Sequence, residues 1–168
     1  MVSARRTYID AIVKPFVRST STFKGSGYYF YDLNAKMNYI VSKKDRLYLS
    51  GYLGKDVFTF KNSERTFNIN VPWGNKTATL RWNHEFNNKL FLNTTVMYND
   101  YNFTFSGGQE SFQVKFFSGI KDWSGKFDLD YYSKFNHNFK FGGQYTYHTF
   151  TPTTVSGEAA GVAFEPDQ

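Results

Sequence analysis

The chain has no cysteine, only four prolines among its 168 residues, and no long apolar run. The missing cysteines exclude disulfides, zinc–thiolate sites and thiol nucleophiles together. No 18 consecutive residues are apolar, so the sequence offers no transmembrane helix, although a membrane-spanning sheet leaves a much weaker signal. The first residues, MVSARR, also lack the apolar core and cleavage site of an export signal. For an exported protein we therefore expect a segment before Met1.

Aromatic residues, by contrast, are abundant. They make up 21% of the chain, with 19 Phe and 13 Tyr, whereas only 20% of residues are charged. Aromatics beside many Asn, Thr, Ser and Gly favour sheets with one apolar and one polar face. The net charge of +6 is typical of a solvated polar face, or of attraction to lipopolysaccharide or an acidic substrate. No basic run is concentrated on one element, so we expect no nucleic-acid partner.

Alternating side chains predict most of the secondary structure. In 28–41 the odd positions, such as Leu33 and Met37, are apolar, while even positions such as Asn34 are polar. Residues 7–17 predict a short helix that Pro15 ends or kinks. The same alternation predicts further strands at 46–60, 76–86, 90–105, 111–132 and 138–150, short turns at 42–45, 87–89 and 133–137, a long loop at 61–75, an intermediate loop at 106–110, and the start of a loop at 151–168.

The alternation changes phase within 111–132. Apolar residues occupy even positions as far as Ile120 and odd positions from Phe127 onward. One extra residue explains the change, so we expect a β-bulge between Ser118 and Gly125. A hairpin turn at Asp122–Gly125 is the alternative explanation, and it would add a strand.

The connections and the strand lengths favour a membrane barrel. Short and longer connections alternate, as in outer-membrane barrels with short periplasmic turns. The apolar stripe from Tyr39 to Tyr29 covers about 33 Å of strand, or roughly 23 Å of membrane at a tilt of about 45°. We therefore predict an all-β fold, namely an antiparallel up-and-down transmembrane β-barrel segment of about seven strands. Such a partial barrel has open edges, so residues 1–168 are expected to be a fragment of the barrel wall.

Five segments, taken in order, carry a family resemblance: SARRTYID (3–10), GYYFYDLNAKMNY (27–39), KDRLYLSGYLGKDVF (44–58), WGNKTATLRWNHEF (73–86) and YHTFTP (147–152). Together they resemble the barrel of TonB-dependent outer-membrane receptors, of the Bacteroidetes-like type with a carboxypeptidase-regulatory-like domain. The resemblance implies a plugged, 22-stranded barrel in the bacterial outer membrane that imports a scarce nutrient, such as a glycan, peptide or metal chelate. It implies as partners outer-membrane lipid, the chain's own plug domain and remaining strands, the TonB complex acting through that plug, and a surface lipoprotein. If the resemblance holds, we expect the plug domain and the remaining strands to lie outside residues 1–168.

Inward-facing side chains near the outer strand ends are the best candidates for solute contact. These are Tyr52, Asp56, Phe58, Asn99, Tyr101 and Phe103, with the loop residues Arg65, Phe67 and Trp73. Stacking of aromatic rings on sugars or apolar ligands is one interpretation, and ordinary loop packing is the other. His84, His137 and His148 show no metal-ligand spacing, and we expect no metal, no cofactor and no enzyme activity. The alternative functions are a complete small outer-membrane barrel enzyme and a soluble carbohydrate-binding β-sandwich.

Overall fold

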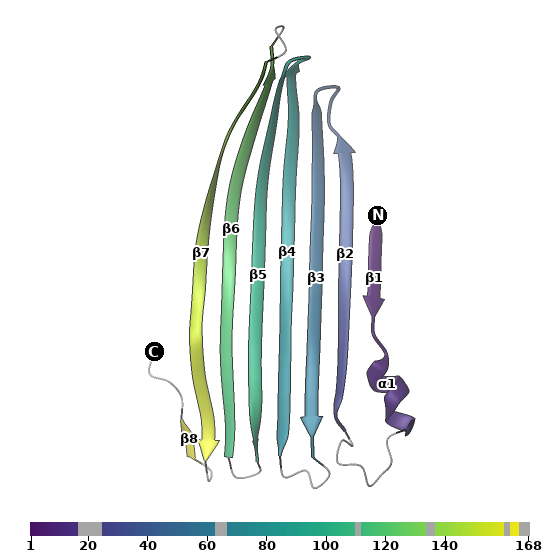
Figure 1. The fold of residues 1–168 in the computed structure, drawn as a ribbon, viewed down its shortest axis with the longest axis vertical. Helices are drawn as coiled ribbons and strands as arrows, with labels where there is room; N and C mark the ends of the chain where they lie inside the picture. The colour runs from purple at the N-terminus through teal and green to yellow at the C-terminus, as the bar shows by residue number, and fades with distance from the viewer. Residues whose placement is uncertain (17–24, 63–66, 110–111, 134–136, 160–161, 165–168) are drawn as a thin grey trace.

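The computed structural model describes residues 1–16, 25–62, 67–109, 112–133, 137–159 and 162–164, and their strands form a single antiparallel sheet (Figure 1). Its eight strands are β1 (Val2–Arg6), β2 (Gly27–Ile40), β3 (Asp45–Lys61), β4 (Asn68–Asn87), β5 (Leu90–Gln109), β6 (Phe112–Tyr132), β7 (Asn138–Ala159) and the three-residue β8 (Val162–Phe164). Each strand pairs only with its neighbours along the chain, so the sheet is up-and-down. The predicted all-β, antiparallel sheet of about seven strands is confirmed, and it is not closed into a barrel.

A short helical segment precedes β2. Helix α1 (Ile9–Val13) is followed by a 3₁₀ turn, η1 (Lys14–Phe16), so the helix predicted within 7–17 is confirmed for its described residues. Pro15 lies in η1, because proline cannot donate the hydrogen bond that would continue an α-helix. No helix in the described part of the chain is long and apolar enough to span a bilayer. The alternation does not predict β1, whose five residues are held by pairing with β2.

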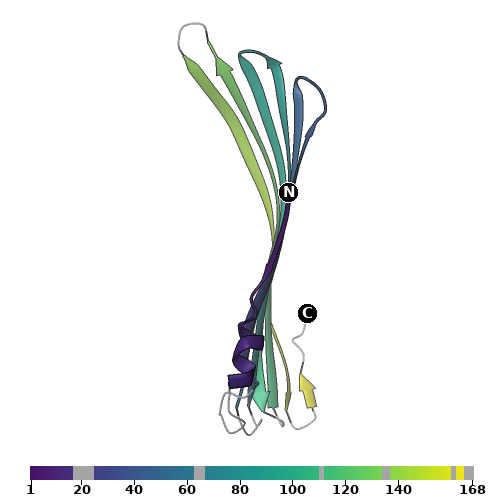
Figure 2. The same cartoon turned by 90° about the vertical axis from the view of Figure 1, so that its right-hand side faces the viewer.

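The strands are long, and the sheet twists along them (Figure 2). The β2–β3, β4–β5 and β6–β7 hairpins turn at the end drawn uppermost in Figure 1, called here the upper end. The opposite ends of these strands lie at the lower end. Strands β4 to β7 contain 20 to 22 residues, about twice the roughly 9–11 needed to cross lipid. The sheet therefore has an upper and a lower half, each long enough to serve a different environment.

The loops predicted for the lower end are too long. The predicted loop 61–75 includes the first residues of β4, which begins at Asn68, and the predicted loop 106–110 includes the end of β5, which reaches Gln109. Residues 151–168, predicted as a loop, contain the end of β7 and all of β8. Cross-strand pairing causes the difference, because the ladders continue to the last described residues of each hairpin. The lower half of the sheet is thus built of strand extensions.

The phase change in β6 has neither of the predicted causes. Pairing of β6 with β5 runs unbroken from Tyr131 to Phe112, so β6 contains no extra residue and no turn. Both the predicted bulge and the alternative turn at Asp122–Gly125 are wrong. The faces of a regular strand exchange character instead, and apolar side chains pass from one face to the other. A register shift does occur beside Ser118, but the extra residue is on β7.

Two prolines interrupt the hydrogen-bonded ladders. Pro152 lies in the two-residue stretch of β7 that faces the single residue Ser118 of β6. Pro72 lies in β4 where the pairing with β5 skips two positions, although its pairing with β3 continues. A proline has no backbone N–H to donate, so strands tolerate it at such irregularities. The sequence signal that predicts a loop around Pro72 therefore marks a local gap in one ladder.

The sheet has no second layer over either face in the described residues. Val57, at 8% exposure, is the one large hydrophobic residue that counts as buried there. Leu33, Leu49 and Leu80 share one face and remain 44–45% exposed. We call this face the belt face and the other the opposite face. The described residues thus form no closed, dry interior, and the fold alone does not explain where its apolar side chains find cover.

Candidate functional site

The belt face carries a continuous apolar belt across the upper half of the sheet. Register places on this face Tyr31, Leu33, Ala35, Met37 and Tyr39 of β2, Leu47, Leu49, Gly51 and Leu53 of β3, Ala78, Leu80, Trp82, His84 and Phe86 of β4, Leu90, Leu92, Thr94, Val96 and Tyr98 of β5, Trp123, Gly125, Phe127, Leu129 and Tyr131 of β6, and Phe139, Phe141, Gly143, Tyr145 and Tyr147 of β7. The belt contains no Lys, Arg, Asp or Glu. Several members are highly exposed, such as Tyr145 at 73%. An apolar surface of this extent marks an interaction surface.

A polar cluster anchors the aromatic rings at the upper rim of the belt. The indole N–H of Trp82 donates to the Asp45 carboxylate at 3.0 Å, and His84 Nδ1 lies 2.6 Å from the same carboxylate. Ser42 Oγ donates to it at 2.6 Å. Asp45 lies at the β2–β3 turn, outside the belt, and hydrogen bonds from Ser42 and His84 lower its pKa to about 2. Rings with an apolar body and a bonded polar tip suit a boundary between hydrocarbon and water.

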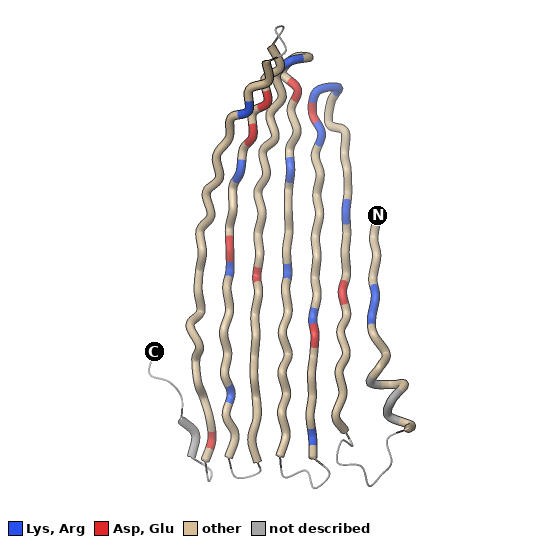
Figure 3. The backbone as a smooth tube through the Cα atoms, in the orientation of Figure 1, with Lys and Arg blue, Asp and Glu red and all other residues tan. Residues whose placement is uncertain are grey.

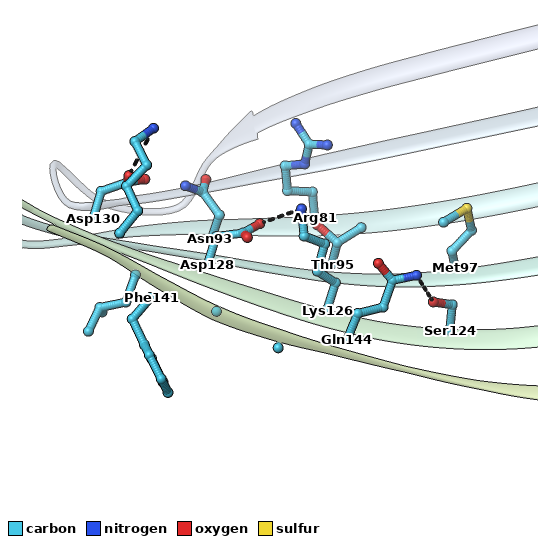
Figure 4. A pocket seen from close by; sticks show the side chains of 14 residues that line it. Arg81, Asn93, Thr95, Met97, Ser124, Lys126, Asp128, Asp130, Phe141 and Gln144 are labelled. Carbon is cyan, nitrogen blue, oxygen red and sulfur yellow. Dashed lines mark hydrogen bonds and ion pairs between the residues drawn. The ribbon is translucent and has the colours of Figure 1, made fainter.

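The opposite face is polar in its upper half and contains a shallow hollow of about 750 Å³ (Figure 4). Lys126 pairs with Asp128 at 2.9 Å, and Lys140 pairs with Asp130 at 3.2 Å. Gln144 donates to Ser124 Oγ at 3.3 Å. The remaining polar lining includes Arg81, Asn93 and Thr95, while Phe141 points to the other side of the sheet. Exposed ion pairs of this kind contribute little stability, typically below about 1 kcal/mol, so this surface suits contact with water and polar groups.

The lower half of the opposite face forms an aromatic zone. Its members, placed by register, are Tyr28, Phe30, Phe58, Phe60, Trp73, Tyr101, Phe103, Phe105, Phe112, Phe116 and Phe150. Tyr28 stacks on Trp73, with ring centroids 6.3 Å apart and an interplanar angle of 26°. The Tyr28 hydroxyl donates to Asp56 Oδ1 at 2.5 Å, and this hydrogen bond raises the pKa of Tyr28, which lies below the belt. The zone combines flat apolar rings with a carboxylate, which suits contact with ring-shaped or amphipathic solutes.

The sequence-predicted contact residues fall mainly on this one face. Tyr52, Asp56 and Phe58 of β3, Trp73 of β4, and Asn99, Tyr101 and Phe103 of β5 all lie there. Trp73 belongs to a strand, not to a loop, and pairs with Asp56 on one side and Phe103 on the other. Asn99 lies nearer the polar half and donates to Asp122 at 3.3 Å. Phe67 lies just before β4, and Arg65 falls outside the described residues.

Tyr28 and Phe30 are members that the sequence reasoning missed. Both occupy even positions of β2, where the alternation of 28–41 predicts polar residues. The signal that could have found them is the repeated phase change. Phe58 and Phe60 of β3 are aromatic at the positions that share a face with polar residues higher in the same strand. A change seen in several paired strands indicates two zones of the sheet, whereas a bulge would affect one strand.

The two faces together define what this sheet can do. One face presents hydrocarbon-like side chains over a limited height, and the other presents a polar hollow that continues into an aromatic zone. Among the described residues, no three His, Asp or Glu side chains lie close enough to share a metal ion. No protein-family model, no curated protein and no solved structure matches the chain.

Proposed function

We propose that the chain is part of the barrel wall of a TonB-dependent outer-membrane transporter that imports a scarce nutrient, such as a glycan, peptide or metal chelate. The belt face would contact outer-membrane lipid, and the opposite face would line the lumen, towards the plug domain. The TonB complex would act through that plug, and a surface lipoprotein would be a further partner. The upper hairpins would then lie on the periplasmic side, and the lower half would project outward.

The observation that carries this proposal is the charge-free apolar belt opposite a polar face. On β6 the belt runs from Tyr131 to Trp123, nine residues, which agrees with the roughly 9–11 residues of a membrane-crossing strand. Alternate residues of the same segment are Asp130, Asp128 and Lys126, on the opposite face. Such a pattern is stable where one face contacts lipid and the other contacts water, because an uncompensated charge in hydrocarbon is destabilising.

The course of the belt supports the proposal independently. Its upper edge on β2 is Tyr39, which lies in the same cross-strand row as Gly143 of β7. On β7, however, the belt continues to Phe139, four residues (143 − 139) further towards the upper end. Four residues over five strand steps, at about 3.4 Å per residue and 4.8 Å per strand, correspond to a tilt of roughly 30°. Strands of outer-membrane barrels tilt by about 35–45°, so an oblique belt edge is what a level membrane requires.

The alternative functions have less support. A β-sandwich needs two packed layers, and the described strands form one sheet. The small barrel enzyme needs one more strand, which a turn at Asp122–Gly125 would have supplied. Strand β6 is continuous there, so that strand is not formed. Neither point bears on catalysis itself, and the absence of enzyme activity stays a prediction.

A cysteine scan tests the membrane placement, and the lack of native cysteine makes it clean. Leu49→Cys and Leu80→Cys place a spin label on the belt face, and the adjacent Ser50→Cys and Thr79→Cys place it on the opposite face. In the membrane-inserted protein, the belt labels should collide with oxygen, which concentrates in lipid. The opposite-face labels should collide with a water-soluble nickel chelate. Equal accessibility of neighbouring positions would rule out the lipid-facing belt.

Transport is tested in cells. Loss of this protein, and loss of the energy-coupling TonB protein, should produce the same growth defect on the same scarce solute. A wild-type copy should restore growth in the first strain but not in the second. Growth that depends on this protein without TonB would leave a barrel in place but exclude energy-coupled import.

A further inference from the structure

We propose that Lys55, Lys76 and Lys121 form a cationic rim that binds the anionic phosphate groups of lipid headgroups along the lower edge of the belt. The inference deepens the proposed function and rests on its membrane placement. The lower edge of the belt face has no role in moving a solute through the lumen. The inference assigns anionic lipid as the partner of this edge.

Pairing places the three lysines side by side just below the belt. Lys76 lies opposite Leu53 on one side and Asp100 on the other, and Asp100 in turn lies opposite Lys121. Lys55 lies opposite Gly74, which is two residues below Lys76 on the same face of the sheet. All three lysines are exposed on the belt face. The rim thus follows β3 to β6, a width of roughly 14 Å at about 4.8 Å per strand.

The charges of the rim are only partly balanced within the sheet, because Asp100 lies between Lys76 and Lys121 in the same row and on the same face. In the described part of the chain, no carboxylate lies within 4.0 Å of the ammonium group of Lys55, Lys76 or Lys121. Lysines of the opposite face behave differently, since Lys126 and Lys140 each pair with an aspartate. With Asp100 counted, the belt-face rim therefore presents a net charge of +2 (3 − 1), and a partner of opposite charge suits it.

The depth of the rim identifies that partner. Ala78 and Trp123 are the lowest belt residues of β4 and β6. Lys76 and Lys121 occupy the next lower positions on the same face, about 7 Å further along each strand. A lysine stem can lie along the apolar surface while its ammonium group reaches the headgroup layer. Figure 3 shows basic and acidic residues along the whole length of the strands. On each of β2 to β7, however, the charged residues that lie between the first and last belt residues of that strand belong to the opposite face. The belt ends where these cations begin, at the level where lipid phosphates would lie.

Fluorescence quenching by brominated lipids tests the rim in the full-length protein, because Trp82 and Trp123 lie in the belt. Vesicles of brominated phosphatidylcholine are titrated with unbrominated phosphatidylglycerol, and the recovery of emission reports which lipid surrounds the belt. One basic residue near an anionic surface raises binding by about fivefold. We therefore expect the wild type to prefer the anionic lipid by at least about fivefold, and the triple variant K55Q/K76Q/K121Q to show a ratio near one.

Two further variants control for charge and for folding. K36Q/K126Q/K140Q removes the same charge from the opposite face and should keep the preference. The triple arginine variant of the rim should also keep it. A wild type quenched equally by both lipids, or a rim variant with unchanged preference, would overturn the cationic rim while leaving the membrane placement intact. Emission that no brominated lipid quenches would overturn the proposed function as well.

Discussion

Leu80→Arg offers the sharpest test of the belt. Leu80 lies four residues from Lys76, where the belt ends below, and six from Phe86, its last belt residue above on β4. At about 3.4 Å per residue and a tilt near 35°, these spans correspond to roughly 11 and 17 Å of depth, so residue 80 lies near the middle of the belt. An arginine at the midplane of an outer-membrane barrel costs about 2–4 kcal/mol. Loss of the half-buried leucine adds about 1 kcal/mol.

The expected destabilisation is therefore about 3–5 kcal/mol, measured by urea unfolding of the vesicle-inserted protein through tryptophan emission. Thr79→Arg is the matched control, because it places the same side chain one residue away on the opposite face. It should change the free energy of unfolding by at most about 0.5 kcal/mol. Equal costs for the two variants, or a larger cost for Thr79→Arg, would refute the assignment of the faces.

Two further predictions concern close packing and pH. A Cβ atom at Gly142 would lie 2.6 Å from the backbone oxygen of Phe127, whereas one at Gly125 would meet nothing within 4 Å. Gly142→Ala should therefore lower the free energy of unfolding, measured by urea titration, by about 1–3 kcal/mol, and Gly125→Ala should leave it unchanged. An unchanged stability of Gly142→Ala would contradict the close packing at this position. The pKa of Asp45 is about 2, below its ordinary value of 3.8, so its stabilising effect is present above about pH 4 and is lost as the pH falls towards 2. Asp45→Asn should flatten this part of the stability profile in thermal unfolding, and an unchanged acid slope would exclude the carboxylate as its source.

The sequence predicts the upper half of the sheet well, because alternation there is strong. Segments 28–41 and 90–105 are recovered, since leucines and tyrosines alternate with asparagines over the height of the belt. The lower ends are missed, because the aromatic residues change face there and the simple pattern fails. Pro72 and the glycines near 107 also predict loops where neighbouring strands in fact hold the chain extended. Pairing partners determine how far a strand continues, and a single sequence does not reveal them.

The candidate site shows the same division. Alternation alone places Tyr52, Asp56 and Phe58 on one face, and register confirms this assignment. The contact of Tyr28 with Asp56 and Trp73 depends on residues that are adjacent across strands but distant in sequence. Such contacts follow from register, which is set by turns and by the fit of whole strands. Sequence periodicity therefore gives the composition of each face but not its clusters.

The exchange of faces along an uninterrupted β6 constrains how this chain can change in length. Deleting or inserting one residue at the change-over point, near Lys121, would rotate half of the strand by one side-chain position. The aromatic rings of the upper and lower halves, which now lie on opposite faces of the sheet, would then lie on the same face. The charged side chains of the upper half would turn towards the lipid. A shift in pairing cannot repair this, because correcting one half spoils the other. Length variation among descendants of this sequence should accordingly accumulate at the tips of the hairpins and be purged from the middle of the strands.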